Sequence, residues 1–264
     1  MQLRRSARIL VTILAAASFG GCGSDDGGGG GGGVGHTVVS ANSDVAGAVT
    51  EYRALLGEPN NGGAPGIHVG GRREINWDAV GDDNSSPHFL PGDFFNAAVA
   101  PRARGAEFST PGVGVQVSAD SDNPDDAAVR FGNINATYTN AFQTFSAERL
   151  FSPIGSNLVD VTFFIPGTAS PAVTTGFGAV YTDVDGGGSS FEYFDADGDS
   201  LGQFDVPEAN NALSFLGVVF DEPVVARVRI KYGNTPLGPD ESEEVDVAVM
   251  DDFLYGEPRL IPVD

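Results

Sequence analysis

The chain has 264 residues, of which 36 are Asp or Glu and 14 are Lys or Arg, so its formal net charge is −22. Because phosphate backbones are bound by clustered Lys and Arg, this balance argues against nucleic acid as a partner. The 41% share of hydrophobic residues is too high for a disordered acidic chain, and the 37 glycines are typical of short strands joined by turns.

Residues 1–21 have the pattern of a bacterial export signal. Arginines near the start give a positive segment, and residues 9–17 form the short apolar segment that such signals contain. Residues 19–22 (Phe-Gly-Gly-Cys) resemble the lipobox, where lipoprotein signal peptidase cuts before a lipidated cysteine, although Phe19 stands where Leu, Val or Ile is usual. The resemblance implies that Cys22, the single cysteine, is the lipid attachment site that anchors the protein to a membrane. The alternative is an ordinary secretory signal with an incidental cysteine.

Residues 22–35 predict a glycine-rich tether, since seven glycines occupy positions 27–33. Such a run has no side chains to pack, so it would hold the body near a membrane rather than against it. The residues after Cys22 lack the aspartate that marks inner-membrane retention in enteric bacteria. By that analogy the outer membrane of the bacterial envelope is favoured, with the leaflet open. Residues 36–264 are expected to form a single globular domain.

One helix is expected at residues 43–56, with Ser43 as its N-terminal cap and Gly57 as its end. Its apolar residues recur at helical spacing: Val45, Val49, Tyr52 and Leu56. Short apolar runs separated by Pro and Gly then predict about ten strands. These lie at residues 73–77, 105–109, 113–118, 138–145, 158–165, 176–183, 190–194, 213–220, 224–232 and 245–255. The sequence therefore predicts a mainly β fold, an antiparallel β-sandwich over about residues 72–257, preceded by a short N-terminal helix.

Two pairs of acids stand where strand alternation would place one member on an apolar face. Asp251 falls on such a face while Asp252 points the other way, and Asp183 ends another apolar face just before Asp185. A buried carboxylate needs hydrogen-bond donors, a cation, or a bulge that turns it outward. A structural calcium ion would satisfy both pairs, because calcium accepts oxygen ligands in flexible geometry. The alternative is that these acids accept hydrogen bonds from turn amides.

Other acidic segments favour structure over chemistry. Residues 195–199 (Asp-Ala-Asp-Gly-Asp) resemble the start of an EF-hand calcium loop, but Ser200 and Val206 stand where that loop requires Gly and Glu. The flanking apolar alternation favours a β-hairpin with an Asp-Gly turn. Residues 120–126 and 240–244 are interpreted as solvated loops.

Few residues point to catalysis. The H-E-x-x-H and S-x-x-K motifs are absent from the sequence, and the single lysine excludes a phosphate-binding P-loop. The three histidines are scattered and are interpreted as surface or loop residues. Trp77 is either a core residue or a platform for stacking sugars, and its alternation with Ile75 favours the core.

Two stretches resemble a group of uncharacterised exported bacterial proteins, some of them lipoproteins and others carrying a C-terminal sorting tail. The first is GRREINWD at residues 71–78 with LPGDFFN at 90–96, and the second extends from FFIPG at 163–167 to MDDFLYG at 250–256, followed by Glu257 and Pro258. The group has no activity to carry over. Its C-terminal half resembles the jelly roll of many carbohydrate-binding modules, in which the late Asp-Asp pair often lies near a structural calcium. The resemblance implies a jelly-roll-like sandwich and gives some support for sugar binding.

These observations predict a bacterial envelope lipoprotein anchored through Cys22, whose β-sandwich binds carbohydrate or another envelope polymer without catalysis. One alternative is a polysaccharide-acting hydrolase, which would need two carboxyl groups about 5 to 9 Å apart in an open cleft. A shallow face with exposed aromatic residues would favour the binding module instead. Another alternative is a structural surface protein without a small ligand.

Overall fold

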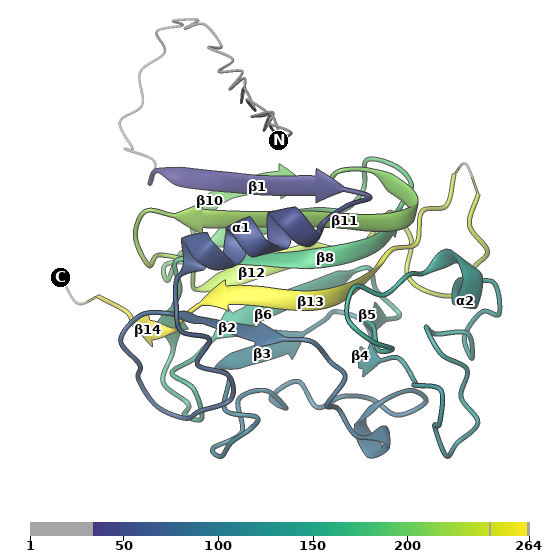
Figure 1. Ribbon diagram of the computed structural model, residues 1–264, viewed down its shortest axis with the longest axis horizontal. Coiled ribbons are helices and arrows are strands. Elements are labelled where there is room, and N and C mark those ends of the chain that lie inside the picture. Colours follow the sequence, from purple (N-terminus) through teal and green to yellow (C-terminus); the bar gives the residue numbers. More distant parts are fainter. Residues whose placement is uncertain (1–33, 243, 263–264) are drawn as a thin grey trace, which may run out of the picture. The chain divides into compact units, whose positions relative to one another are not determined.

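The computed structural model describes residues 34–242 and 244–262. The predicted signal peptide, Cys22 and nearly all of the tether lie outside these residues. Within them the protein is mainly β, as predicted: two antiparallel sheets enclose a common core, and a helix covers the outer side of one sheet (Figure 1). No helix in the described part of the chain is long and apolar enough to cross a membrane.

Seven strands form the first sheet, in the order β1-β11-β8-β13-β5-β4, with β2 also paired to β13. Their bounds are β1 (His36–Asn42), β2 (Arg72–Ile75), β4 (Gly114–Val117), β5 (Phe151–Ile154), β8 (Gly176–Val184), β11 (Ala209–Phe220) and β13 (Val249–Gly256). Strand β8 lies between β11 and β13, and every one of its residues is buried. This central position explains why its sequence contains no charged residue before Asp183 and is mostly apolar.

Five strands form the second sheet, in the order β10-β9-β12-β6-β3. They are β3 (Ala106–Ser109), β6 (Leu158–Phe163), β9 (Ser190–Phe194), β10 (Ser200–Asp205) and β12 (Arg227–Lys231). A separate ribbon pairs β7 (Ala172–Val173) with β14 (Arg259–Leu260). The helical elements are α1 (Ala46–Leu56), α2 (Tyr138–Ala141) and a 3-10 turn at Asp82–Asn84.

The core between the sheets is rich in aromatic residues, and Trp77 lies at one of its centres. The Trp77 ring stacks on Phe151 with 4.2 Å between ring centroids and meets Phe253 edge-on at 4.9 Å. Its indole Nε1 donates a hydrogen bond to the backbone oxygen of Asp251 at 2.9 Å. Trp77 is therefore a core residue, as its alternation predicts, and it offers no surface for stacking a sugar.

Helix α1 packs on the outer face of the first sheet, as Figure 1 shows. The ring of Tyr52, in this helix, lies over Gly178 and Gly217 on neighbouring strands. A Cβ added at Gly178 would stand 2.8 Å from a ring atom, and one added at Gly217 would stand 2.5 Å away. The Tyr52 hydroxyl donates to the backbone oxygen of Val218 at 3.0 Å. Glycine at both strand positions lets the helix approach the sheet and anchors it there.

Several predicted elements differ from the structure. The helix begins at Ala46, and its N-terminus has no side-chain cap, so the prediction of Ser43 as the cap is wrong. The predicted strand at 138–145 is also wrong, because α2 begins at Tyr138. Tyr138 and Phe142 lie one turn apart and stack with 4.8 Å between ring centroids in a small separate cluster. The predicted strands at 224–232 and 245–255 are shorter than expected.

Two strands of the first sheet were not predicted. Strand β1 lies at the sheet edge and buries only Val39, so its sequence shows little alternation. Strand β5 contains Pro153, a residue that normally argues against a strand.

Candidate functional site

Asp183 occupies an unusual position at the end of β8. The preceding Tyr181 and the following Val184 both face the sandwich core, so the strict alternation of the strand is interrupted at this point. Asp183 has a φ of 66°, in the left-handed region that Asp tolerates better than bulkier residues. Its Oδ1 accepts a hydrogen bond from the backbone nitrogen of Asn211 at 2.6 Å. The residue is fully buried, but it has left the apolar face on which alternation placed it.

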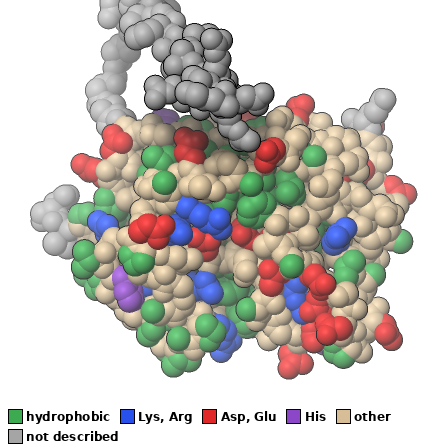
Figure 2. All heavy atoms as spheres, in the orientation of Figure 1, with side chains coloured by type: hydrophobic (Ala, Val, Ile, Leu, Met, Phe, Trp, Pro, Cys, Tyr) green, Lys and Arg blue, Asp and Glu red, His purple; other side chains and the backbone are tan. Residues whose placement is uncertain are grey.

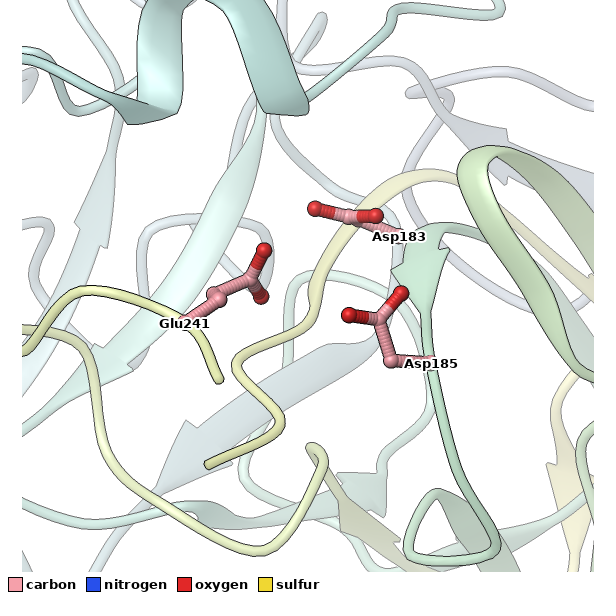
Figure 3. Close-up of side chains that lie close together, drawn as sticks. All are labelled: Asp183, Asp185 and Glu241. Atoms are coloured by element: carbon pink, nitrogen blue, oxygen red, sulfur yellow. The ribbon is translucent and has the colours of Figure 1, made fainter. Parts of the chain in front are cut away.

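Three carboxyl groups converge beside this strand end. Figure 3 shows Asp183 and Asp185 facing Glu241, which comes from the loop between β12 and β13. One oxygen from each of the three side chains lies within 4.8 Å of the others. Asp185 and Glu241 are half-buried, so the group opens toward solvent on one side.

A fourth carboxyl group, that of Asp246, borders the same group and is only 5% exposed. Its Oδ1 accepts a hydrogen bond from the backbone nitrogen of Asp185 at 3.2 Å. Its Oδ2 is buried without a hydrogen-bond partner, as are Oδ2 of Asp183 and Oδ1 of Asp185. We call Asp183, Asp185, Glu241 and Asp246 the acidic cluster.

Burial makes the ionised carboxylates of the acidic cluster unfavourable. Burial raises the pKa of Asp183 and of Asp246, and the charge of Asp185 raises both further, whereas hydrogen bonds from backbone N–H groups, and for Asp183 also one with Glu241, act in the opposite direction. Burial, together with the neighbouring Asp183, raises the pKa of Glu241 to about 8. A proton on Glu241, or a cation bound between the carboxyl groups, would offset this cost.

A polar pocket of about 510 Å³ opens next to the acidic cluster. Its walls are amide, carboxyl and hydroxyl side chains and a glycine turn. The lining residues are Asp185, Gly186, Gly187, Gly188, Asn210, Asn211, Asn234, Glu241, Ser242 and Asp246. The volume is in the range of sites that bind small molecules, whereas the polarity of the lining suits a hydroxyl-rich or charged ligand.

The second predicted pair, Asp251 and Asp252, lies at a bulge in β13. The register of β13 against β8 shifts between Met250 and Phe253, so both of these residues face the core and the two aspartates fall between them. Asp251 Oδ2 accepts hydrogen bonds from the backbone nitrogens of Phe145 and Ser146 at 2.6 and 3.2 Å. Asp251 thus has the amide donors that a buried carboxylate needs, and the bulge takes it off the core face without turning it out to solvent, since it is fully buried.

Ser146 links the two aspartates through its hydroxyl. Its Oγ lies 2.8 Å from Asp252 Oδ1 and 3.1 Å from Asp251 Oδ1. Burial, and then the neighbouring Asp252, raises the pKa of Asp251 to about 8, and burial also raises that of Asp252. This environment therefore favours a proton shared between the two carboxyl groups.

Each predicted pair has its own set of partners. Asp183 and Asp185 join Glu241 and Asp246, whereas Asp251 and Asp252 surround Ser146. The sequence does not identify Glu241 as a site residue, because the segment 240–244 to which it belongs has the pattern of a solvated loop. Its only signal in the sequence is the high density of acids there.

The acidic segment at residues 195–199 forms the predicted hairpin turn between β9 and β10. Asp195 Oδ1 accepts hydrogen bonds from the backbone nitrogens of Asp197 and Asp199 at 3.0 and 2.9 Å. Residues 198–202 (Gly-Asp-Ser-Leu-Gly) also match the G-x-S-x-G pattern of serine hydrolases. Here the segment enters a strand rather than a helix, and the Ser200 hydroxyl bonds Glu192 at 3.1 Å instead of a histidine.

Comparison with known proteins assigns no family, since no family model and no curated protein matches the chain. A two-domain protein of unknown function from Bacteroides fragilis is 13% identical, with a TM-score of 0.23, over 63% of this chain and 48% of its own. The enzymatically active domain of tailspike protein 4 from bacteriophage CBA120 is 14% identical, with a TM-score of 0.24, over 68% of this chain and 21% of its own. The chain spans less than half of each, and neither TM-score defines a shared fold. The fold and site define an antiparallel β-sandwich with an acidic cluster beside a polar pocket.

Proposed function

We propose that this protein is a lipoprotein of the bacterial cell envelope, with the outer membrane as its favoured location and Cys22 as its lipid attachment site. Its β-sandwich acts as a non-catalytic module that binds a carbohydrate or another envelope polymer. The observation that supports the binding role is the polar pocket, because a wall of Asn side chains and glycine backbone can both donate and accept hydrogen bonds.

The mode of recognition follows from which side chains are available at the surface. Trp77 is buried, and Phe89 is the large aromatic side chain that is clearly exposed in the described part of the chain. Recognition would therefore depend on hydrogen bonds to hydroxyl groups in the pocket rather than on stacking against aromatic rings. Gly186 and Gly187 leave room for a polymer to lie across the pocket mouth, since a Cβ at Gly186 would meet no atom within 4 Å.

The negative charge of the surface limits which polymers the protein can bind. Figure 2 shows acidic side chains spread over one face of the molecule, with fewer basic side chains among them. With a net charge of −22, a neutral polymer, or one whose acidic groups are bridged by cations, fits this surface better than a bare polyanion.

Blocking the pocket tests the binding role. Gly186→Trp places a large side chain at the pocket wall, where a Cβ meets no atom within 4 Å, and Gly81→Trp is a matched control, because a Cβ at Gly81 also meets no atom within 4 Å. In co-sedimentation with isolated envelope polysaccharides and peptidoglycan, we expect G186W to bind at least tenfold more weakly than wild type, and G81W to bind normally. Equal binding by G186W and wild type would contradict the assignment of the pocket.

A second candidate function is polysaccharide hydrolysis. It is favoured by one observation: Glu241, with its pKa raised to about 8, faces Asp185 in an open pocket, as a general acid faces a second carboxylate in glycosidases. Release of reducing ends from a bound polymer, lost in Glu241→Gln, would identify the hydrolase. Binding without release would support the binding module. The absence of both binding and release would point to a structural surface protein.

A further inference from the structure

The acidic cluster contains more carboxylate oxygens than there are N–H groups donating hydrogen bonds to them. Asp183, Asp246 and Glu241 are each held by one backbone N–H, from Asn211, Asp185 and Val247 respectively, at 2.6, 3.2 and 3.1 Å. These bonds fix Oδ1 of Asp183, Oδ1 of Asp246 and Oε1 of Glu241 in place, whereas Oδ2 of Asp183 and Oδ2 of Asp246 have no hydrogen-bond partner. Such an arrangement orients carboxylates without neutralising them.

The free oxygens provide a second observation, independent of the clustering itself. Two buried carboxylate oxygens have no hydrogen-bond partner. One is Oδ2 of the fully buried Asp183, and the other is Oδ2 of Asp246, which lies outside the group of three. Leaving buried carboxylate oxygens without a partner costs free energy, and a cation is the group that satisfies several of them at once.

The donor set selects the type of cation. Every ligand atom within the group of three is a carboxylate oxygen, with neither histidine nor cysteine among them, which excludes the usual environment of zinc. The ligands come from a strand end and a separate loop, and the polar residues Asn210, Asn234 and Ser242 are among those that line the adjoining pocket. Many oxygen ligands in irregular geometry suit calcium, whereas magnesium requires a nearly ideal octahedron and retains most of its water.

We infer that Asp183, Asp185 and Glu241 form a calcium site, with Asp246 as a fourth carboxylate at its edge. The ion would connect the end of β8 to the loop between β12 and β13. It would therefore fix two walls of the polar pocket relative to each other. This site goes beyond the proposed binding function, since calcium would bind and stabilise the protein whether or not a polymer is recognised.

Calcium binding to the chelator-stripped protein tests the inference. Isothermal titration with CaCl₂ should show a saturable site, and millimolar calcium should raise the thermal midpoint by several degrees, because an ion that binds only the folded state stabilises it. Magnesium at the same concentration should give a much smaller rise.

Three variants locate the site. Glu241→Gln and Asp183→Asn should weaken calcium binding at least tenfold, and Asn tolerates the left-handed backbone at position 183. Glu244→Gln removes the same charge from an exposed position nearby and should bind calcium like wild type. The half-buried Glu241 keeps the test valid if Asp183→Asn folds poorly. Absence of a calcium response in wild type, an equal response to magnesium, or unchanged affinity in E241Q would overturn the inference.

Discussion

Arg73 and Glu257 form an ion pair that is inaccessible to solvent, with side-chain exposure of 0% for both residues. Arg73 Nε and Nη2 donate to the two carboxylate oxygens of Glu257 at 2.8 and 2.7 Å. Nη1 of Arg73 donates to three backbone oxygens, those of Gly62, Ala64 and Ala103. The pair thus connects β2 and the end of β13 to two loops.

Removing one partner of this pair should be strongly destabilising. In Glu257→Gln the Arg73 charge stays buried without its counter-charge, so we expect a loss of about 3 to 5 kcal/mol in the free energy of unfolding. The measurement is urea denaturation followed by tryptophan fluorescence, which reports on the buried Trp77. Arg229→Gln serves as the control, because the Arg229–Asp160 pair is partly exposed and should contribute about 1 kcal/mol or less. Equal losses in the two variants would contradict this account of the buried pair.

Stability should fall as pH rises, and the Asp251–Asp252 pair should contribute to this fall beside Glu241, whose pKa is also raised to about 8. The pKa of Asp251 is about 8 in the folded protein against 3.8 for an ordinary aspartate, so folding favours its protonated form. The resulting stabilisation is complete below about pH 4 and is lost as pH rises through about 8. Thermal midpoints measured in chelator at pH 5 and pH 8 should therefore differ, with the lower midpoint at pH 8.

Asp251→Asn imitates the protonated carboxyl group. Its amide oxygen can still accept from the backbone nitrogens of Phe145 and Ser146, and its amide nitrogen can donate to Asp252. We expect the variant to lose much of the fall in stability between pH 5 and pH 8 and to exceed wild type at pH 8. An unchanged pH dependence in the variant would exclude Asp251 as its source.

The contact between Tyr52 and the glycines of the first sheet should limit substitution. In Gly217→Ala the new methyl group would stand 2.5 Å from the Tyr52 ring, so helix α1 must shift, at a cost of about 1 to 3 kcal/mol. Gly47→Ala, within α1 and with no atom within 4 Å of its Cβ, should instead stabilise by about 0.5 to 1 kcal/mol. Urea denaturation of both variants checks this, and a destabilised G47A together with a neutral G217A would show that packing on the sheet is not decisive.

The elements that sequence predicts well are those whose burial pattern is local. Val49, Tyr52 and Leu56 are the buried face of α1, and β9 has the predicted bounds, because both patterns can be read from adjacent residues. The strand pattern fails at β13, where Met250 and Phe253 both face the core. A bulge changes which residues face inward, and period-two alternation contains no sign of it.

The candidate site was predictable only in part, for a similar reason. Alternation identified Asp183 as anomalous, and the structure shows the anomaly as a left-handed residue with an unpartnered buried oxygen. Glu241 and Asp246 reach the same point from a loop that follows four further strands, β9 to β12. Their convergence depends on the antiparallel placement of β8 beside β13, which spacing along the chain does not encode.

Lipidation of Cys22 would determine where the protein is located. If Cys22 carries diacylglycerol, the protein should sediment with membranes and incorporate a labelled fatty acid. Cys22→Ser leaves no other cysteine in the chain to modify, so the label should be lost and the protein should move to the soluble fraction. Ser24→Ala, two residues away, controls for changes in signal processing and should stay lipidated. A Cys22→Ser protein that still incorporates the label and still sediments with membranes would refute the anchor. Release of a folded domain that still responds to calcium would show that Cys22 is needed for membrane attachment and not for folding or calcium binding.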